Sequence, residues 1–157
     1  ALLGFFAGYG MLSRQLLLRG GPAHPLLLLL EQQHFECTRY EYSMNRVVDV
    51  AAALAARGYN PQLACELELA VTADPVFGDN VGCFRVAVRD GRAEVTRVRE
   101  PCADALSLDV RALASLYGGF FSPAQLALTD AVGGTARGLD LAALVFSGPT
   151  AAMPDMF

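Results

Sequence analysis

Few side chains in this sequence have the type and spacing that metal chemistry requires. The two histidines, His24 and His34, each stand alone, without a second ligand at the spacing of a metal site. No CxxC pair occurs among the four cysteines, which are Cys37, Cys65, Cys83 and Cys102. The sequence therefore predicts no metal site. We expect free thiols, although an even number of cysteines also permits two disulfides.

The serines, glycines and carboxylates match no catalytic motif. No serine lies in a GxSxG turn. The stretch GGTARG (133–138) lacks the spacing of a phosphate-binding loop, so we interpret it as a flexible loop. Asp104 and Asp109 could act as an acid and a base, but a helix N-cap explains Asp109 without catalysis.

The remaining candidate is the α-carboxylate of Phe157, at the end of the apolar tail PDMF. A chain end is usually solvated. An apolar tail could instead lie in a groove, where burial would raise the carboxylate pKa above about 3.5 and let it act as a base. The residues alone leave both possibilities open.

The elements that would position these groups follow from apolar spacing and from capping residues. Asp109 and Ser122-Pro123 are start signals of helices, and Gly118-Gly119 is a break between them. Asp49 and Gly58 bound another helix in the same way. The predicted helical regions are 1–18, 25–33, 49–58, 110–117 and 122–146, the last interrupted at Gly133-Gly134 and Gly138.

Alternating apolar residues predict strands over 38–48, 65–71, 82–99 and 106–108. The third region is a hairpin, in which Asp90-Gly91 suits a two-residue type I′ turn and places Val86 opposite Val95. The expected fold class is α+β, a mainly antiparallel sheet with helices packed on one face.

Composition excludes several classes of partner. The 157 residues include 12 basic ones, all arginine, and 16 acidic ones, for a net charge of −4, which argues against nucleic acid. No apolar run reaches the roughly 18 residues of a membrane span, and the first residues lack the basic region of a secretory signal.

The length of the chain predicts one domain with a fragment of a neighbouring domain attached. We expect the protein to lie in a reducing cytoplasm.

Four features occur in a distinctive order. They are MNRVVDVAAALAARGY (44–59), the Asp79-Asn80 and Gly82 turn, LSLDVRALASLYGG (106–119) and the terminal aromatic carboxylate. This order resembles the C-terminal part of the enhanced-intracellular-survival (Eis) group of GNAT acetyltransferases. The resemblance implies a sterol-carrier-protein-like domain over 38–157. Residues 1–37 would then be the tail of a preceding acetyltransferase domain and a linker.

The resemblance also implies a function. Members of the group acetylate amines with acetyl-CoA held in another domain, and no [RQ]xxGx[GA] loop occurs in this chain. We therefore expect no cofactor-binding residues here and acetyl-CoA in the parent protein. The chain alone would be inactive, would complete the amine-substrate pocket and would support homo-oligomerisation. Phe157 would supply the general base, while Met156 replaces an acidic residue of some relatives and argues against aminoglycoside-type substrates.

Two other functions fit the same residues. A stand-alone sterol-carrier-like module would bind a lipid or another hydrophobic ligand in an apolar groove, since 54% of the residues are hydrophobic. A purely structural interaction domain is the simplest alternative.

Overall fold

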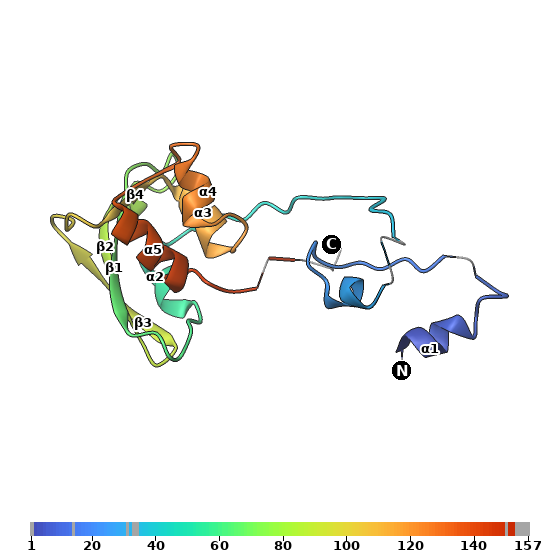
Figure 1. Ribbon diagram of the computed structural model, residues 1–157. Helices are drawn as coiled ribbons and strands as arrows, with labels where there is room; N and C mark the ends of the chain where they lie inside the picture. Colours follow the sequence, from blue (N-terminus) through green and yellow to red (C-terminus); the bar gives the residue numbers. More distant parts are fainter. Residues whose placement is uncertain (1, 14, 31, 33–34, 150, 153–157) are drawn as a thin grey trace. The chain divides into compact units, whose positions relative to one another are not determined.

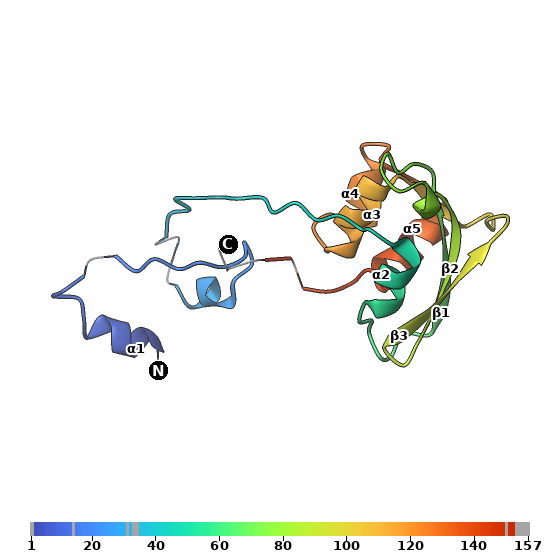
Figure 2. The ribbon, with the colours of Figure 1, turned by 180° about the vertical axis from the view of Figure 1, so that it is seen from behind.

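The computed structural model describes residues 2–13, 15–30, 32, 35–149 and 151–152. The chain divides into two compact units, Ala1–Glu36 with Ala152–Phe157, and Cys37–Ala151 (Figures 1 and 2). The prediction for Phe157 falls outside the described residues.

The smaller unit contains α1 (Leu2–Ala7) and the short 3-10 helix η1 (Pro25–Leu29). The predicted helix over 1–18 is wrong beyond Ala7. Gly8 and Gly10 follow directly, and glycine costs about 1 kcal/mol in a helix. Nothing offsets that cost, because Phe5 and Tyr9 remain exposed. The predicted helix over 25–33 is the shorter η1, and part of that range lies outside the described residues.

The larger unit is built on a five-stranded sheet with the order β3-β2-β1-β4-β5. Three of the four strand pairs are antiparallel, and β1 pairs with β4 in parallel. The expected α+β class with a mainly antiparallel sheet is confirmed. The strands are β1 (Cys65–Val71), β2 (Gly82–Arg89), β3 (Arg92–Val98), β4 (Leu106–Leu108) and β5 (Val132–Gly133).

The β2–β3 hairpin has the predicted turn and register. Asp90 and Gly91 have φ angles of 51° and 77°, as a type I′ turn requires. Val86 lies opposite Val95 in the ladder. A two-residue shift of this turn would keep the apolar face inward, but the register is fixed by the local Asp-Gly signal.

Four helices cover one face of the sheet, as predicted (Figures 1 and 2). They are α2 (Val50–Ala56), α3 (Val110–Tyr117), α4 (Pro123–Ala127) and α5 (Ala136–Val145). Between them and the sheet lies one core, which includes Leu69, Val86 and Leu113, each without exposed surface. The alternation along β1 and β2 supplies the sheet side of this core.

The predicted helix starts are confirmed by their hydrogen bonds. The Asp49 carboxylate accepts from the Ala52 N–H at 2.9 Å, and the Asp109 carboxylate accepts from Arg111 and Ala112 at 3.0 and 2.8 Å. Ser122 and Gln125 form a reciprocal capping box. These side chains satisfy backbone donors that would otherwise lack partners at each helix start.

The prediction for 122–146 is wrong in its middle. The chain leaves α4 after Ala127, pairs β5 with β4, and starts α5 behind the Thr135 cap. The stretch 133–138, predicted to be a flexible loop, is a loop only at 134–135, because Gly133 ends β5 and Ala136 begins α5. Gly138 does not interrupt α5. It lies in the first turn, where a Cβ atom would collide with the carbonyl oxygen of Asp104.

The strand predicted over 38–48 is also wrong. These residues are extended but join no ladder among the described residues. Val47 is buried, whereas Tyr42 and Met44 point their side chains into solvent. Both sides of β1 are already occupied, by β2 and β4, so this segment has no central strand to pair with.

Candidate functional site

Arg57, at the C-terminal end of α2, holds the start of the C-terminal segment. Its guanidinium donates to the carbonyl oxygens of Val145, Phe146 and Ser147 at 3.0, 3.2 and 3.5 Å. Its Cζ atom also lies 5.2 and 5.3 Å from the ring centres of Tyr59 and Phe146. A cation that caps the last carbonyls of α5 complements the helix dipole and fixes the point from which the tail departs.

The tail then passes the turn between α3 and α4. A Cβ atom at Gly119 would lie 3.4 Å from the carbonyl oxygen of Pro149, and Gly119 has a φ of 68°. Glycine therefore suits this position twice, because the turn is left-handed and the tail approaches closely. Arg57 thus holds residues 145–147, and the backbone at Pro149 passes beside the Gly119 turn.

Tyr59 is buried beside Arg57. Its hydroxyl donates to the carbonyl oxygen of Leu54 at 2.6 Å. Burial raises the pKa of Tyr59 to about 12, and the nearby Arg57 charge opposes that rise only in part. The phenol therefore stays protonated at neutral pH and acts as a structural donor.

A second polar cluster surrounds Asp74, which has no exposed side-chain surface. Oδ1 accepts from Arg46 at 2.5 Å and from the N–H groups of Val76 and Phe77 at 2.9 and 3.1 Å. Oδ2 accepts from the Asn80 amide at 2.8 Å. Burial on its own would raise the pKa of Asp74, but these hydrogen bonds outweigh it and hold the pKa well below its usual range.

Asn80 connects this cluster to the start of α2. Its Oδ1 accepts from the Val50 N–H at 3.0 Å, and its amide donates to the carbonyl oxygen of Val48 at 2.9 Å. The Asp79-Asn80 turn, which is part of the resemblance to the Eis group, thus has a structural role: Asn80 links the Asp74 cluster to the residues before and at the start of α2. Asp74 and Asn80 fix where the extended segment 37–48 enters the domain.

Glu68 is a buried carboxylate on the sheet face that the helices leave open. Oε1 accepts from Arg85 Nε at 2.9 Å and forms an ion pair with Arg85 Nη2 at 2.9 Å, and Oε2 accepts from the Cys102 N–H at 2.6 Å. Burial favours a raised pKa, but the hydrogen bonds from Cys102 and Arg85 lower it overall. Arg85 and the backbone at Cys102 thus cover a carboxylate that lies on the face opposite the core.

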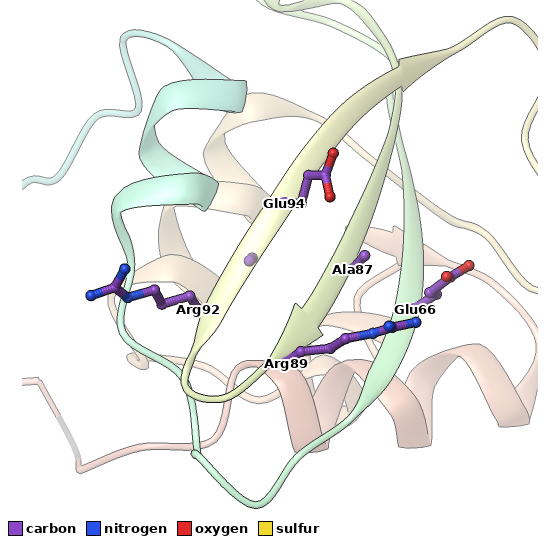
Figure 3. A pocket seen from close by; sticks show the side chains of 6 residues that line it. Glu66, Ala87, Arg89, Arg92 and Glu94 are labelled. Carbon is purple, nitrogen blue, oxygen red and sulfur yellow. The ribbon is translucent and has the colours of Figure 1, made fainter.

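A depression of about 440 Å³ lies on the same open face (Figure 3). Glu66, Ala87 and Glu94 are register partners across the three strands, so two carboxylates flank a small side chain. Arg89 and Arg92 border it at the hairpin end. Mixed charge with no nucleophile makes this a binding surface at most, not a reaction centre.

A smaller depression of about 240 Å³ is lined by polar residues that include Thr72, Asp109 and Asp130. Asp109 is already engaged in capping α3. Neither depression is an apolar tunnel, so neither provides the groove that a lipid carrier needs. The described residues contain no group of His, Cys, Asp and Glu that could hold a metal ion.

The other candidates from the sequence have local structural roles. His24 Nδ1 accepts from the Leu26 N–H at 3.2 Å and starts η1. The carboxylate of Asp104 accepts from the Thr135 hydroxyl at 2.7 Å and pairs with Arg137 at 3.6 Å, so it is not an acid partner of Asp109. His34 lies outside the described residues.

The four cysteines carry free thiols. Burial raises the pKa of the Cys65 thiol, which makes it less reactive than an ordinary cysteine. Among the described residues, no helix has the length and apolar character to cross a membrane.

Most of the larger unit matches a known protein family. The profile of the sterol carrier protein domain matches residues 50–154, and the chain is a member of that family. None of the curated proteins matches it.

Several solved acetyltransferase structures contain a similar domain. A GCN5-related N-acetyltransferase from Anabaena variabilis is 39% identical, with a TM-score of 0.66, over 71% of this chain and 28% of that protein. One from Kribbella flavida is 31% identical, with a TM-score of 0.68, over 87% of this chain and 34% of that protein. Eis1 from Mycobacterium abscessus is 29% identical, with a TM-score of 0.56, over 69% of this chain and 26% of that protein. The chain thus spans about a quarter to a third of each protein's length.

Proposed function

We propose that this chain is the C-terminal domain of an Eis-like GNAT N-acetyltransferase, inactive alone, that completes the amine-substrate pocket and supports oligomerisation. The observation that carries this proposal is the 39% identity to a GCN5-related N-acetyltransferase of which the chain covers only 28%. Acetyl-CoA would bind in a part of the parent protein that this chain does not include. A cytoplasmic location belongs to the same proposal.

The division of the chain supports this assignment. Residues 38–157 would form the sterol-carrier-like domain, and residues 1–37 the tail of an acetyltransferase domain and a linker. The match to the Kribbella flavida protein covers 87% of this chain, more than the larger unit Cys37–Ala151 alone contains. The likeness to an acetyltransferase therefore extends into the smaller unit.

In this proposal, the carboxylate of Phe157 is the general base that accepts a proton from the substrate amine. A terminal carboxylate suits this role because no onward chain obstructs it. The hydrogen bonds of Arg57 support the role indirectly, because they hold the tail where it leaves α5.

The first experiment is an immunoblot of cell extract with antibody raised against this chain. A band with room for two further domains supports the proposal, and a band near 16.7 kDa contradicts it. The same protein, once purified, should transfer acetyl groups from acetyl-CoA to an amine.

The second experiment adds one glycine after Phe157 in the native protein. We expect kcat to fall by about 10²- to 10⁴-fold, the usual contribution of a general base, with little change in KM for acetyl-CoA. Met156→Leu is the matched control, since it keeps the chain length and the terminal carboxylate. Unchanged turnover in the extended protein would remove Phe157 from the mechanism.

A further inference from the structure

Four aromatic rings form a continuous chain on the surface of the larger unit. Tyr40 and Tyr42 come from the extended segment 37–48, and Phe120 and Phe121 from the turn after α3. The ring centres are 4.9 Å apart for Tyr40–Tyr42, 5.7 Å for Tyr42–Phe120 and 4.5 Å for Phe120–Phe121. We refer to these four residues as the aromatic patch.

The aromatic patch is exposed to an unusual degree. Its members keep between 40% and 72% of their surface accessible, and Met44 beside them in sequence is fully exposed. Contiguous aromatic surface of this kind marks protein interfaces, because large rings gain most from burial and a phenol keeps a polar edge.

The backbone under half of the patch joins no strand ladder among the described residues. Residues 38–46 are extended and alternate in side-chain type, yet they form no ladder with any described strand. An extended segment whose backbone joins no ladder is a template for pairing with the edge of another sheet. The alternating residues of 38–46 form no strand within this unit. They suit a strand whose ladder partner lies in another domain.

The position of the patch favours one occupant. Phe120 follows Gly119, which the C-terminal segment passes at Pro149. The segment that carries Tyr40 and Tyr42 is held to the domain further along, where Arg46 binds Asp74 and the Asn80 amide donates to the carbonyl oxygen of Val48. A domain that covered the patch would thus lie next to the departure point of the tail that carries Phe157.

We propose that the aromatic patch docks the acetyltransferase portion of the same polypeptide, with residues 38–46 adding a strand to the edge of a sheet there. This inference rests on the proposed function. It commits to a partner in cis because the similar solved proteins are about three to four times as long as the matched domain. The patch carries little net charge, since Arg39 pairs with Glu41 at 2.5 Å, so nucleic acid and anionic lipid are poor occupants.

Hydrogen exchange of the native, full-length protein tests the proposal. We expect the amides of 38–46 to exchange at least about tenfold more slowly than an unstructured peptide, because ladder hydrogen bonds must open first. Exchange at the unstructured rate would overturn the docking. Protection that disappears on dilution, or that appears only with lipid vesicles, would assign the patch to a second copy or a membrane and would also overturn it.

Paired variants separate docking from folding. Tyr42→Ser with Phe120→Ser should remove the protection of 38–46, while the protection of β1 and β2 stays unchanged. Leu128→Ser is the matched control, since Leu128 is an equally apolar and more exposed residue outside the patch. Retained protection in the double variant would contradict the proposal.

Failure of the docking proposal can be told apart from failure of the proposed acetyltransferase function. A native protein no longer than this chain would remove both proposals. A longer protein that acetylates amines, but whose residues 38–46 exchange freely, would remove only the docking.

Discussion

Two segments of the larger unit have the same alternating pattern, and only one of them forms a ladder. Residues 82–98 fold into β2 and β3, with Val86 and Val95 paired on the buried face. Residues 38–48 carry tyrosines and a methionine at alternate positions and remain extended without a partner among the described residues.

The difference lies in what each segment can reach. The Asp90-Gly91 turn brings two alternating runs together within a few residues, so the hairpin supplies its own partner. The segment 38–48 has no such turn, and both neighbours of β1 are already in place. Alternating apolar residues therefore predict a strand with one face to bury. Only a turn sequence such as Asp90-Gly91 predicts which neighbouring strand it pairs with.

The largest expected difference in stability is between two variants that each place one carboxylate in one of these segments. Val86→Asp would bury an unpaired carboxylate at a site without exposed surface and should cost more than about 4 kcal/mol of unfolding free energy. Met44→Asp should change it by less than about 0.5 kcal/mol, since Met44 is fully exposed. Urea denaturation followed by circular dichroism measures both. Equal losses would show that 38–48 is packed in the isolated chain.

The next largest effect comes from Asp74, which binds Arg46 where the segment 38–48 joins the domain. The Asp74 pKa is lowered on folding, so its contribution to stability is present above the ordinary value of about 3.9 and is lost as the pH falls below it. Asp74→Asn removes this contribution and should flatten the decline in stability below about pH 4. Asp79→Asn, a nearby exposed carboxylate, is the control. An unchanged acid profile in Asp74→Asn would contradict the assignment.

A smaller effect tests the hairpin turn. Gly91→Ala places a Cβ atom at a φ of 77° and should cost about 1–2 kcal/mol. Gly58→Ala is matched to it, because a Cβ atom there meets nothing within 4 Å and φ is not left-handed. Thermal unfolding of the two variants compares them, and an equal loss would mean that the turn conformation is not what the hairpin depends on.

The smallest effect concerns the hydroxyl that supports the end of α2 against this turn. Tyr59→Phe removes the hydrogen bond to Leu54 and should cost about 0.5–1.5 kcal/mol at neutral pH. Because the pKa of Tyr59 rises on folding to about 12, the stability that it confers is complete below pH 10 and is lost towards pH 12. The variant should lack this alkaline component in pH-dependent denaturation. If the difference in unfolding free energy between the unmodified protein and Tyr59→Phe stays constant from pH 8 to 12, the role assigned to the Tyr59 hydroxyl is wrong.

The sequence predicts those parts of the fold whose signals are local. Asp109, Ser122 and Asp90-Gly91 each act on backbone groups within three residues, so their residue types suffice to place a helix start or a turn. The helix over 1–18 and the strand over 38–48 depend on a surface to pack against, and apolar spacing alone does not say whether one exists.

The candidate site was less accessible to sequence analysis. Arg57 reaches residues 88 to 90 positions away, and Arg46 reaches Asp74 over 28 positions. Nothing in the local pattern marks either arginine. The cation–carbonyl contacts appear only when α2 and α5 are packed, whereas the role of Phe157 stays a prediction from the resemblance.

The strand order has a consequence for how this domain is made. β1 pairs with β2 and, through Leu69 and Leu106, with β4 on the far side of the whole hairpin. During synthesis at about 5–20 residues per second, β1, β2 and β3 leave the ribosome before β4 does. The nascent chain therefore carries an open edge on its central strand for about 2–7 seconds at that rate, and an unpaired edge is a template for pairing with another chain.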